Sequence, residues 1–372
     1  MTMQFQMPAF HAPDFSRPEL QNAPCVRFQP APANGVAPDN YHATSVYPEY
    51  LQIEKGNWVL LSKSRMDCAV VLEPGNRLAV TELRRLNAGD LIACGRSENG
   101  EDGILVHTKP FDFPDYMAEK FAFRSHLTRE TSFSIDYDEL YQLIHHEKEH
   151  GFIVWVLGPA VVFDRDARNA FVSLIENGYV HALLAGNALA THDVEGAIFG
   201  TALGQEIYSK RTLPLGHYKH LDAINRIRTA GSIEKAIETG LVQNGIMHAV
   251  TLNRIPYVLA GSIRDDGPLP EVTENVCEAQ NQMRELSQKA TTVIAMATQL
   301  HTIAVGNMTP SYHVMPDERI RPVYFYSVDM SEFAASKLAD RGSLTARSIL
   351  TNVQDFVVTV ERGLRDRFTC PT

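Results

Sequence analysis

The chain has 372 residues, with 34 basic and 44 acidic side chains and a formal net charge of −10. This acidic balance disfavours a dedicated nucleic-acid-binding protein, because neutralising phosphates requires a concentrated basic face. The hydrophobic fraction of 44% is ordinary for a globular enzyme and excludes a mainly disordered or collagen-like chain. The length favours two domains.

The cysteines and the N-terminal residues both indicate the cellular compartment of the protein. The five cysteines lie far apart and form no CxxC pair, which predicts free thiols in a reducing compartment. The N-terminus lacks the basic start and apolar core of a signal peptide. The longest strongly apolar stretch, 152–163, is too short to cross a bilayer. We therefore expect a cytoplasmic protein that does not associate with membranes.

Residues 1–40 contain 7 of the 20 prolines, which predicts an extended arm. Residues 41–135 read as a β-rich domain. Its expected strands are rich in β-branched and apolar residues and are separated by turn-forming residues; they cover 57–61, 67–72, 77–81, 90–94 and 103–107.

Residues 136–372 alternate apolar strands with amphipathic helices. The expected strands cover 152–157, 180–185, 257–260, 292–297 and 323–328. The expected helices cover 137–150, 168–177, 193–200, 220–230, 233–239 and 271–290, with another starting near 331. This alternation predicts an α/β fold, in which a Rossmann-like parallel sheet is covered on both faces and binds its ligand beyond the carboxyl ends of the strands.

Small and polar residues follow these strands. Glycine there lets a ligand approach the backbone, helix N-termini favour a pyrophosphate, and a strand-end carboxylate such as Asp329 can hold a ribose hydroxyl. The alternative is that the glycines only turn the chain and Asp329 caps a helix. Neither GxGxxG nor GxxxxGK[ST] occurs, so a standard dehydrogenase and a P-loop kinase are disfavoured.

Two charged segments are candidates for substrate chemistry. Arg264, Asp265 and Asp266 lie in a turn bounded by glycine and proline, where a carboxylate can hold a substrate ammonium or accept its proton, or the segment can be a surface turn. His217, Lys219 and His220 precede a helix. They can handle substrate or protons, cap the helix, or bind a metal, for which no third ligand is near in sequence.

The segment 146–150 matches HExxH, the helical motif of zinc proteases. Gly151 ends the helix directly after the second histidine and a buried strand begins, whereas the zinc motif needs a helix that continues on both sides. We therefore predict no metal site in this protein.

Several segments resemble the archaeal-type ornithine cyclodeaminase family. They are LLAGNALATHDVE (183–195), NGIMH (244–248), PYVLAGSIRDDGPLPEV (256–272), ATQLHTIAVGN (297–307) and KLADRGS (337–343). The resemblance covers roughly residues 41–360 and extends to the LOR/SDH conserved domain and to the cyclodeaminase half of cyanobacterial arginine dihydrolase. It implies an NAD-binding core similar to deoxyhypusine synthase with a smaller N-terminal β-domain.

The resemblance also implies a reaction: bound NAD takes a hydride from the amine-bearing carbon of a diamino acid, the imine cyclises with loss of ammonia, and the hydride is returned. For L-ornithine the product is proline. The implied cofactor-binding residues are Gly158, Pro159, Gly186, Asn187, Ala188, Ser262, Asp329, Gly342 and Ser343. The implied catalytic residues are Asp265, Asp266, His301 and Asn307, and the implied substrate-binding residues are Arg264, His217, Lys219 and His220.

One departure from the family concerns the GHxxH segment, where the family usually has Arg-His and this chain has Tyr218-Lys219. A related diamino acid is therefore an alternative substrate. The alternatives to cyclodeamination are another NAD-dependent amine or imine oxidoreductase, of opine or diamine type, and a non-catalytic NAD or amino-acid sensor. We expect a homodimer or homotetramer, because relatives of this fold place active sites near subunit contacts.

Overall fold

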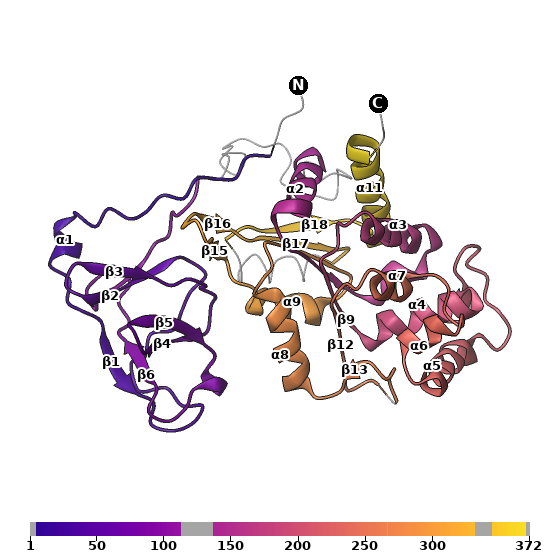
Figure 1. Cartoon of the computed structure of the whole chain (residues 1–372), viewed down its shortest axis with the longest axis horizontal. Coiled ribbons are helices and arrows are strands. Elements are labelled where there is room, and N and C mark those ends of the chain that lie inside the picture. Colours follow the sequence, from indigo (N-terminus) through magenta and orange to yellow (C-terminus); the bar gives the residue numbers. More distant parts are fainter. Residues whose placement is uncertain (1–4, 113–136, 266, 332–343, 370–372) are drawn as a thin grey trace.

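A seven-stranded, fully parallel sheet forms the centre of the larger part of the chain in this computed structural model, which describes residues 5–112, 137–265, 267–331 and 344–369 (Figure 1). The strand order is β13 (Val272–Thr273), β12 (Tyr257–Ala260), β9 (Ala182–Gly186), β8 (Ile153–Leu157), β14 (Thr292–Met296), β17 (Tyr324–Asp329) and β18 (Ala346–Leu350). Leaving aside the two-residue β13, this is the 3-2-1-4-5-6 order of a Rossmann fold. The predicted α/β class is confirmed.

Successive side chains of the central strands point to opposite faces, and each face has its own core. Trp155 and Leu157 of β8 belong to the larger core, whereas Val154 and Val156 belong to the smaller one. The larger core contains residues of α2 (Tyr137–His150), α3 (Arg165–Glu176), α4 (Asn187–Phe199), α5 (Lys219–Ala230), α6 (Ile233–Glu238), α7 (Ile246–Leu252) and α11 (Val353–Leu364). The smaller core contains residues of α8 (Val276–Ser287) and α9 (Gln299–Met308).

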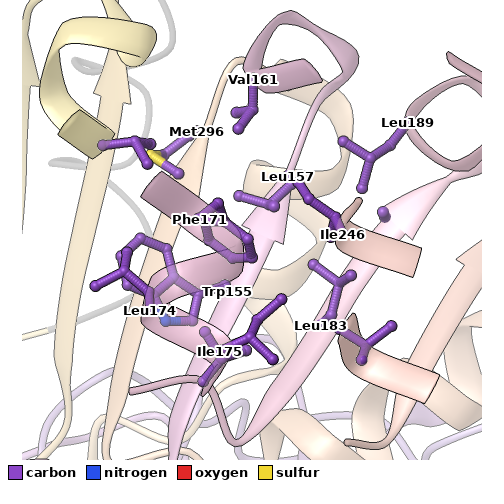
Figure 2. Close-up of a cluster of buried hydrophobic side chains, with 14 of the residues drawn as sticks. Trp155, Leu157, Val161, Phe171, Leu174, Ile175, Leu183, Leu189, Ile246 and Met296 are labelled. Atoms are coloured by element: carbon purple, nitrogen blue, oxygen red, sulfur yellow. The ribbon is translucent and has the colours of Figure 1, made fainter. Parts of the chain in front are cut away.

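Figure 2 shows part of the larger core, where side chains of α3 lie against β8. The rings of Trp155 and Phe171 meet edge to face, with centroids 5.2 Å apart. The indole N–H of Trp155 donates to the carbonyl of Tyr179 at 2.9 Å, so this buried polar atom is satisfied. Because β8 is buried on both sides, it is a continuous apolar run rather than an alternating one.

The N-terminal part of the chain forms two antiparallel sheets, which lie beside the α/β part (Figure 1). One sheet has the order β1 (Arg27–Pro30), β6 (Leu91–Cys94), β4 (Ala69–Glu73) and β5 (Arg77–Thr81), and the other has the order β3 (Asn57–Leu60), β2 (Glu49–Glu54) and β7 (Ile104–Val106). Shorter elements complete the chain: α1 (Pro18–Gln21), η1 (Leu83–Arg85), η3 (Pro159–Phe163), β10 (Thr201–Ala202), β11 (Gln205–Glu206), η4 (Gly216–Tyr218), β15 (Tyr312–Val314), β16 (Ile320–Pro322) and η5 (Arg365–Thr369).

Three sequence-based expectations differ from the structure. The predicted arm is wrong for residues 27–30, which pair with β6. The helix expected from 193 starts at Asn187, directly after β9. The helix expected from 271 starts at Val276, because Val272 instead pairs with Leu259 as part of β13. The helix expected near 331 lies largely outside the described residues.

Candidate functional site at the carboxyl edge of the sheet

The ends of five strands lie along one edge of the parallel sheet, as the sequence predicted. Ala260 pairs with Gly186, and Met296 pairs with both Leu157 and Val328. The chain therefore leaves neighbouring strands at Gly261, Gly186, Gly158, Ala297 and Asp329. The chain leads from β8 to its neighbour β9 in one direction along the sheet, and from β14 to its neighbour β17 in the other direction. The strand order therefore reverses between β8 and β14, and ligands of such folds bind at this switch point.

Two glycines at this edge lie close to other parts of the chain, and the approach of backbone requires glycine at Gly158. A Cβ on Gly158 would lie 1.8 Å from the carbonyl oxygen of Ala297, and one on Gly186 would lie 2.9 Å from Cε1 of His301. The N–H of Gly158 donates to the carbonyl of Met296 at 2.8 Å, which joins the ends of β8 and β14. The next residue, Pro159, is half-buried and begins η3. Both glycines therefore pack the floor of the site.

The helices that begin at this edge leave their first N–H groups available. Neither α4, which follows Gly186, nor α9, which follows Thr298, has a side-chain cap. By contrast, side chains of Asp164, Ser232, Asn275 and Asn352 cap α3, α6, α8 and α11. Uncapped helix N-termini at a strand edge suit an anion such as a pyrophosphate, so Asn187 and the exposed Ala188 are positioned to contact one.

Asn187 also connects the start of α4 to the charged turn after β12. Its Nδ2 donates to Oδ1 of Asp265 at 3.2 Å, and its Oδ1 accepts from the N–H of Leu269 at 3.2 Å. The other carboxylate oxygen of Asp265 accepts from the N–H of Ser262 at 2.8 Å. Ser262 and Arg264 are exposed. Asp266 lies outside the described residues.

His301 lies over Gly186, at the first turn of α9. Burial lowers the pKa of its imidazole, and its Nδ1 is buried without a hydrogen-bond partner among the described residues. Asn307 is on the same helix but six residues later, about 9 Å farther along the axis at 1.5 Å per residue. Its Oδ1 is also buried without a partner in the described parts of the chain.

Asp329 ends β17 beside the end of β14. Its Oδ1 accepts from the N–H of Ser331 at 2.8 Å, which is the contact of a local turn. Its side chain is half-buried. Gly342 and Ser343, which were also predicted to contact the cofactor, lie outside the described residues.

The segment 216–220 starts α5 and lies against α4. His217 is exposed and its ring lies 4.2 Å from that of Tyr218, whereas Lys219 lies over the ring of Phe199 at 4.7 Å. His220 is half-buried, and its Nδ1 has no hydrogen-bond partner among the described residues. His217 is therefore the exposed member of the three, whereas Lys219 and His220 are half-buried.

Sequence reasoning missed a buried, hydrogen-bonded histidine–glutamate pair beside His220. Nδ1 of His192 lies 2.8 Å from Oε2 of Glu195, and the rings of His192 and His220 are 6.0 Å apart. The signal was a histidine and a glutamate three residues apart in LATHDVE. It was not recognised because the helix was expected to start at 193.

The HExxH segment serves the packing of α2 against the sheet. Glu147 is fully buried, with Oε1 accepting from Arg321 at 2.7 Å and Oε2 accepting from Thr291 and Thr292. Within the described ranges, no group of three or more His, Cys, Asp or Glu residues is arranged to hold a metal. In the same ranges, no helix has the length and apolar character needed to cross a membrane.

Comparison with known proteins identifies the relatives of this architecture. Residues 139–360 match the family model described as arginine dihydrolase ArgZ-like, C-terminal, Rossmann fold. Ornithine cyclodeaminase of Methanopyrus kandleri is 38% identical over 342 residues, which cover 91% of this chain and 78% of the relative. The bifunctional arginine dihydrolase/ornithine cyclodeaminase ArgZ of Synechocystis is 35% identical over 345 residues, covering 89% of this chain and 45% of ArgZ.

Two solved structures of related proteins are also similar to this chain in fold. A putative LOR/SDH protein from Methanococcus maripaludis has a TM-score of 0.83 at 33% identity, with 92% of this chain and 99% of that chain covered. The ternary complex of AgrE with ornithine and NAD+ has a TM-score of 0.58 at 31% identity, with 94% of this chain and 47% of that chain covered.

Proposed function

Because the chain belongs to the ornithine cyclodeaminase family, we propose that it converts L-ornithine to proline and ammonia. It is an α/β enzyme of the ammonia-lyase type that uses NAD. When bound, NAD takes a hydride from the amine-bearing carbon of the substrate and returns it to the cyclic imine, so the reaction has no net redox change. The observation that carries the proposal is the meeting of the uncapped start of α4 with Asp265 and His301 at the switch point.

The residues of this edge suit the cofactor. The free N–H groups at the start of α4 would hold the pyrophosphate, close to the backbone at Gly186. Asp329 would accept from a ribose hydroxyl, as strand-end carboxylates do in this fold class. Gly158 and Pro159 would form the floor under the cofactor, with Ser262 at its rim.

The polar groups around this edge suit a diamino acid. Arg264 would bind the substrate carboxylate, and Asp265, fixed by Asn187, would hold an ammonium group. His301 would lie over the reacting carbon of the substrate. Asp266 and Asn307 are predicted to contact the substrate as well. Of the predicted substrate contacts His217, Lys219 and His220, the half-buried His220 would contact the far end of the substrate. The neutral imidazole favoured by burial at His301 can accept a proton.

Isotope labelling tests the internal hydride transfer. L-Ornithine carrying deuterium on the α-carbon should yield proline that retains the label at its α-carbon, because the hydride leaves and returns without exchange with water. Loss of the label to solvent would contradict internal return. Accumulation of labelled, reduced cofactor would instead favour the amine oxidoreductase alternative. A protein that binds NAD and ornithine without turnover would be a sensor.

We also propose that the protein is a cytoplasmic homodimer or homotetramer. The supporting observation is a set of exposed apolar side chains from the turn after β10 to the first turn of α5: Leu203, Tyr208, Leu215, Tyr218 and Leu221, each at least 50% exposed. Light scattering coupled to size exclusion should give two or four times the 41.5 kDa chain mass. A 41.5 kDa particle would contradict the assembly.

A further inference from the structure

A second acid–base group lies beside the site, in the buried cluster of His192, Glu195 and His220. We propose that His192 is the residue that exchanges protons with the substrate amines, and that Glu195 is its positioning residue. This inference rests on the proposed function and adds to it, because family resemblance and strand-end reasoning assigned no role to either residue.

The hydrogen bond to Glu195 fixes the state of the His192 ring. Oε2 of Glu195 lies 2.8 Å from Nδ1 of His192, and the carboxylate is completely buried. A carboxylate can only accept, so Nδ1 carries the proton in this pair and Nε2 of a neutral ring carries the lone pair. Within the part of the chain that the structure describes, Nε2 has no hydrogen-bond partner. The nitrogen left free is therefore the one that can accept a proton.

Glu195 is held as an anion by several donors. Oε1 accepts from Thr201 Oγ1 at 2.8 Å and from the N–H of Gly204 at 3.2 Å, and Oε2 also accepts from the N–H of Leu203 at 3.2 Å. Burial raises the pKa of this carboxyl, but the hydrogen bonds from His192, Thr201 and Gly204 outweigh it and lower the pKa overall. A carboxylate fixed in this way orients an imidazole as in hydrolase triads.

The cluster lies between the two parts of the proposed site. His192 is on the same face of α4 as Ala188, one turn from the exposed helix start at the carboxyl edge. The ring of Phe163, at the end of η3 and five residues after Gly158, meets the His192 ring edge-on at 5.4 Å. On the other side, the ring of His220 lies 6.0 Å away, with its Nδ1 unpartnered among the described residues.

Glu195 also connects the dyad to the segment that carries His220. Its acceptance from Gly204 fixes the turn after β10. Gly204 packs directly on Gly216, where an added Cβ would lie 2.5 Å from the carbonyl oxygen of Gly204. One carboxylate therefore sets both the ring of His192 and the position of residues 216–220.

The proposed proton steps balance. Nε2 of His192 removes one proton from the substrate ammonium, which leaves a neutral amine. The C–H bond then breaks with transfer of its electron pair as hydride to bound NAD, and the C–N bond becomes an iminium. The second substrate ammonium gives a proton to water, adds to this carbon as a neutral amine, and then loses the extra proton of the new C–N bond to water. The protonated His192 returns its proton to the first nitrogen, which leaves as ammonia as the C–N bond breaks and the cyclic iminium forms. The same group thus serves as base and then as acid.

The test compares H192Q with H42Q in the full-length protein. His42 is a matched control, because its Nε2 pairs with buried Glu49 at 2.7 Å in the β-rich part, away from the site. H192Q should lower kcat by about 10²- to 10⁴-fold, the usual contribution of a general acid–base group, with KM and the Kd for NAD nearly unchanged. H42Q should keep kcat. Calorimetric NAD titration and thermal unfolding of both variants give readouts besides turnover.

Two further variants separate catalysis from packing. In H192A, added imidazole should restore part of the lost kcat, an effect that a packing role would not produce. In E195Q, the amide N–H would donate to Nδ1 and force the proton onto Nε2, so kcat should fall although His192 is present. If the wild type is active and H192Q has the same kcat, or if H192Q and H42Q lose kcat equally, the proposed role of His192 is wrong and the proposed function of the protein still stands. A wild type that converts no diamino acid would contradict the proposed function, and this role falls with it.

Discussion

Asn187 is the residue that joins the most parts of the candidate site. It bonds to Asp265, Leu269 and Thr191, so it ties the turn after β12 to the start of α4. N187A should lower the free energy of unfolding by about 1–3 kcal/mol, because the buried N–H of Leu269 loses its acceptor. The Kd for NAD should rise as well. Urea unfolding and calorimetry measure the two effects.

Asn177 provides the control for this variant, because its amide is exposed and, among the described residues, bonds within the end of α3. N177A should change the free energy of unfolding by less than about 0.5 kcal/mol and leave NAD binding intact. Equal effects of the two substitutions would contradict the connecting role of Asn187.

His301 should make stability depend on pH. Burial lowers its pKa from the ordinary 6.5, so the folded state binds this proton less readily than the unfolded state. Its contribution is complete above about pH 6.5 and is lost as the pH falls toward the lowered folded-state pKa. H301Q should therefore flatten the fall in unfolding free energy below about pH 6.5. Parallel slopes for wild type and H301Q would contradict this.

At the residue scale, the sequence predicted the positions that depend on strand ends alone. Gly158, Gly186 and Asp329 lie where a parallel sheet must place them. The pairing of His192 with Glu195 has a local signal, since the two lie three residues apart on α4, but the position of His220 beside them depends on the tertiary path of the chain. Asp266, Gly342 and Ser343 stay predictions.

At the scale of elements, the joined ends of β8 and β14 leave no room for a side chain. G158A would place a methyl group against the backbone of Ala297, so the strand ends must shift. The free energy of unfolding should fall by about 1–3 kcal/mol, the usual cost of overpacking. Turnover should fall further, because the floor of the site moves.

Gly196 is the matched control for this substitution. It lies inside α4, where an added Cβ would come no closer than 3.6 Å to any atom outside the adjacent backbone of the helix. G196A should be neutral or stabilise the protein by up to about 1 kcal/mol, because alanine favours a helix over glycine. Chemical denaturation of both variants gives the comparison. Similar free energies of unfolding for G158A and G196A would mean that the ends of β8 and β14 have room for an added methyl group.

The elements differ in how far local sequence determines them. Helix α2 and strand β12 have the predicted bounds, because each is a strongly patterned segment ended by a glycine. The start of α8 does not, because Val272 fits the helical period yet pairs with Leu259. Strand β1 lies in a proline-rich segment, and its pairing with β6 depends on residues 60 or more positions away. Long-range pairing overrides local pattern in both cases.

At the scale of the whole molecule, Glu82 connects the β-rich part to the α/β part. It pairs with Arg65 of its own region and with Arg284 of α8, both of which are buried. E82Q would leave two buried guanidinium groups facing each other. The free energy of unfolding should fall by about 3–5 kcal/mol, as is usual when one partner of a buried ion pair is removed.

E73Q serves as the control for E82Q. Glu73 pairs with Arg77 at 3.3 Å on an exposed strand end, and such surface pairs contribute about 0–1 kcal/mol. Urea denaturation of both variants measures the difference. A loss at E82Q no larger than at E73Q would show that this triad does not hold the two parts together. No sequence pattern predicts this triad of Arg65, Glu82 and Arg284, because Arg65 and Arg284 are 219 residues apart.

The central claim is that the whole protein performs an internally balanced conversion of a diamino acid. The most direct measurement is mass spectrometry of the purified full-length protein incubated with NAD and L-ornithine, with the cofactor absorbance followed in the same sample. The account predicts proline and ammonia in equal amounts, with catalytic NAD and no accumulation of its reduced form. Reduced cofactor formed in step with product, or bound NAD with no proline, would contradict it.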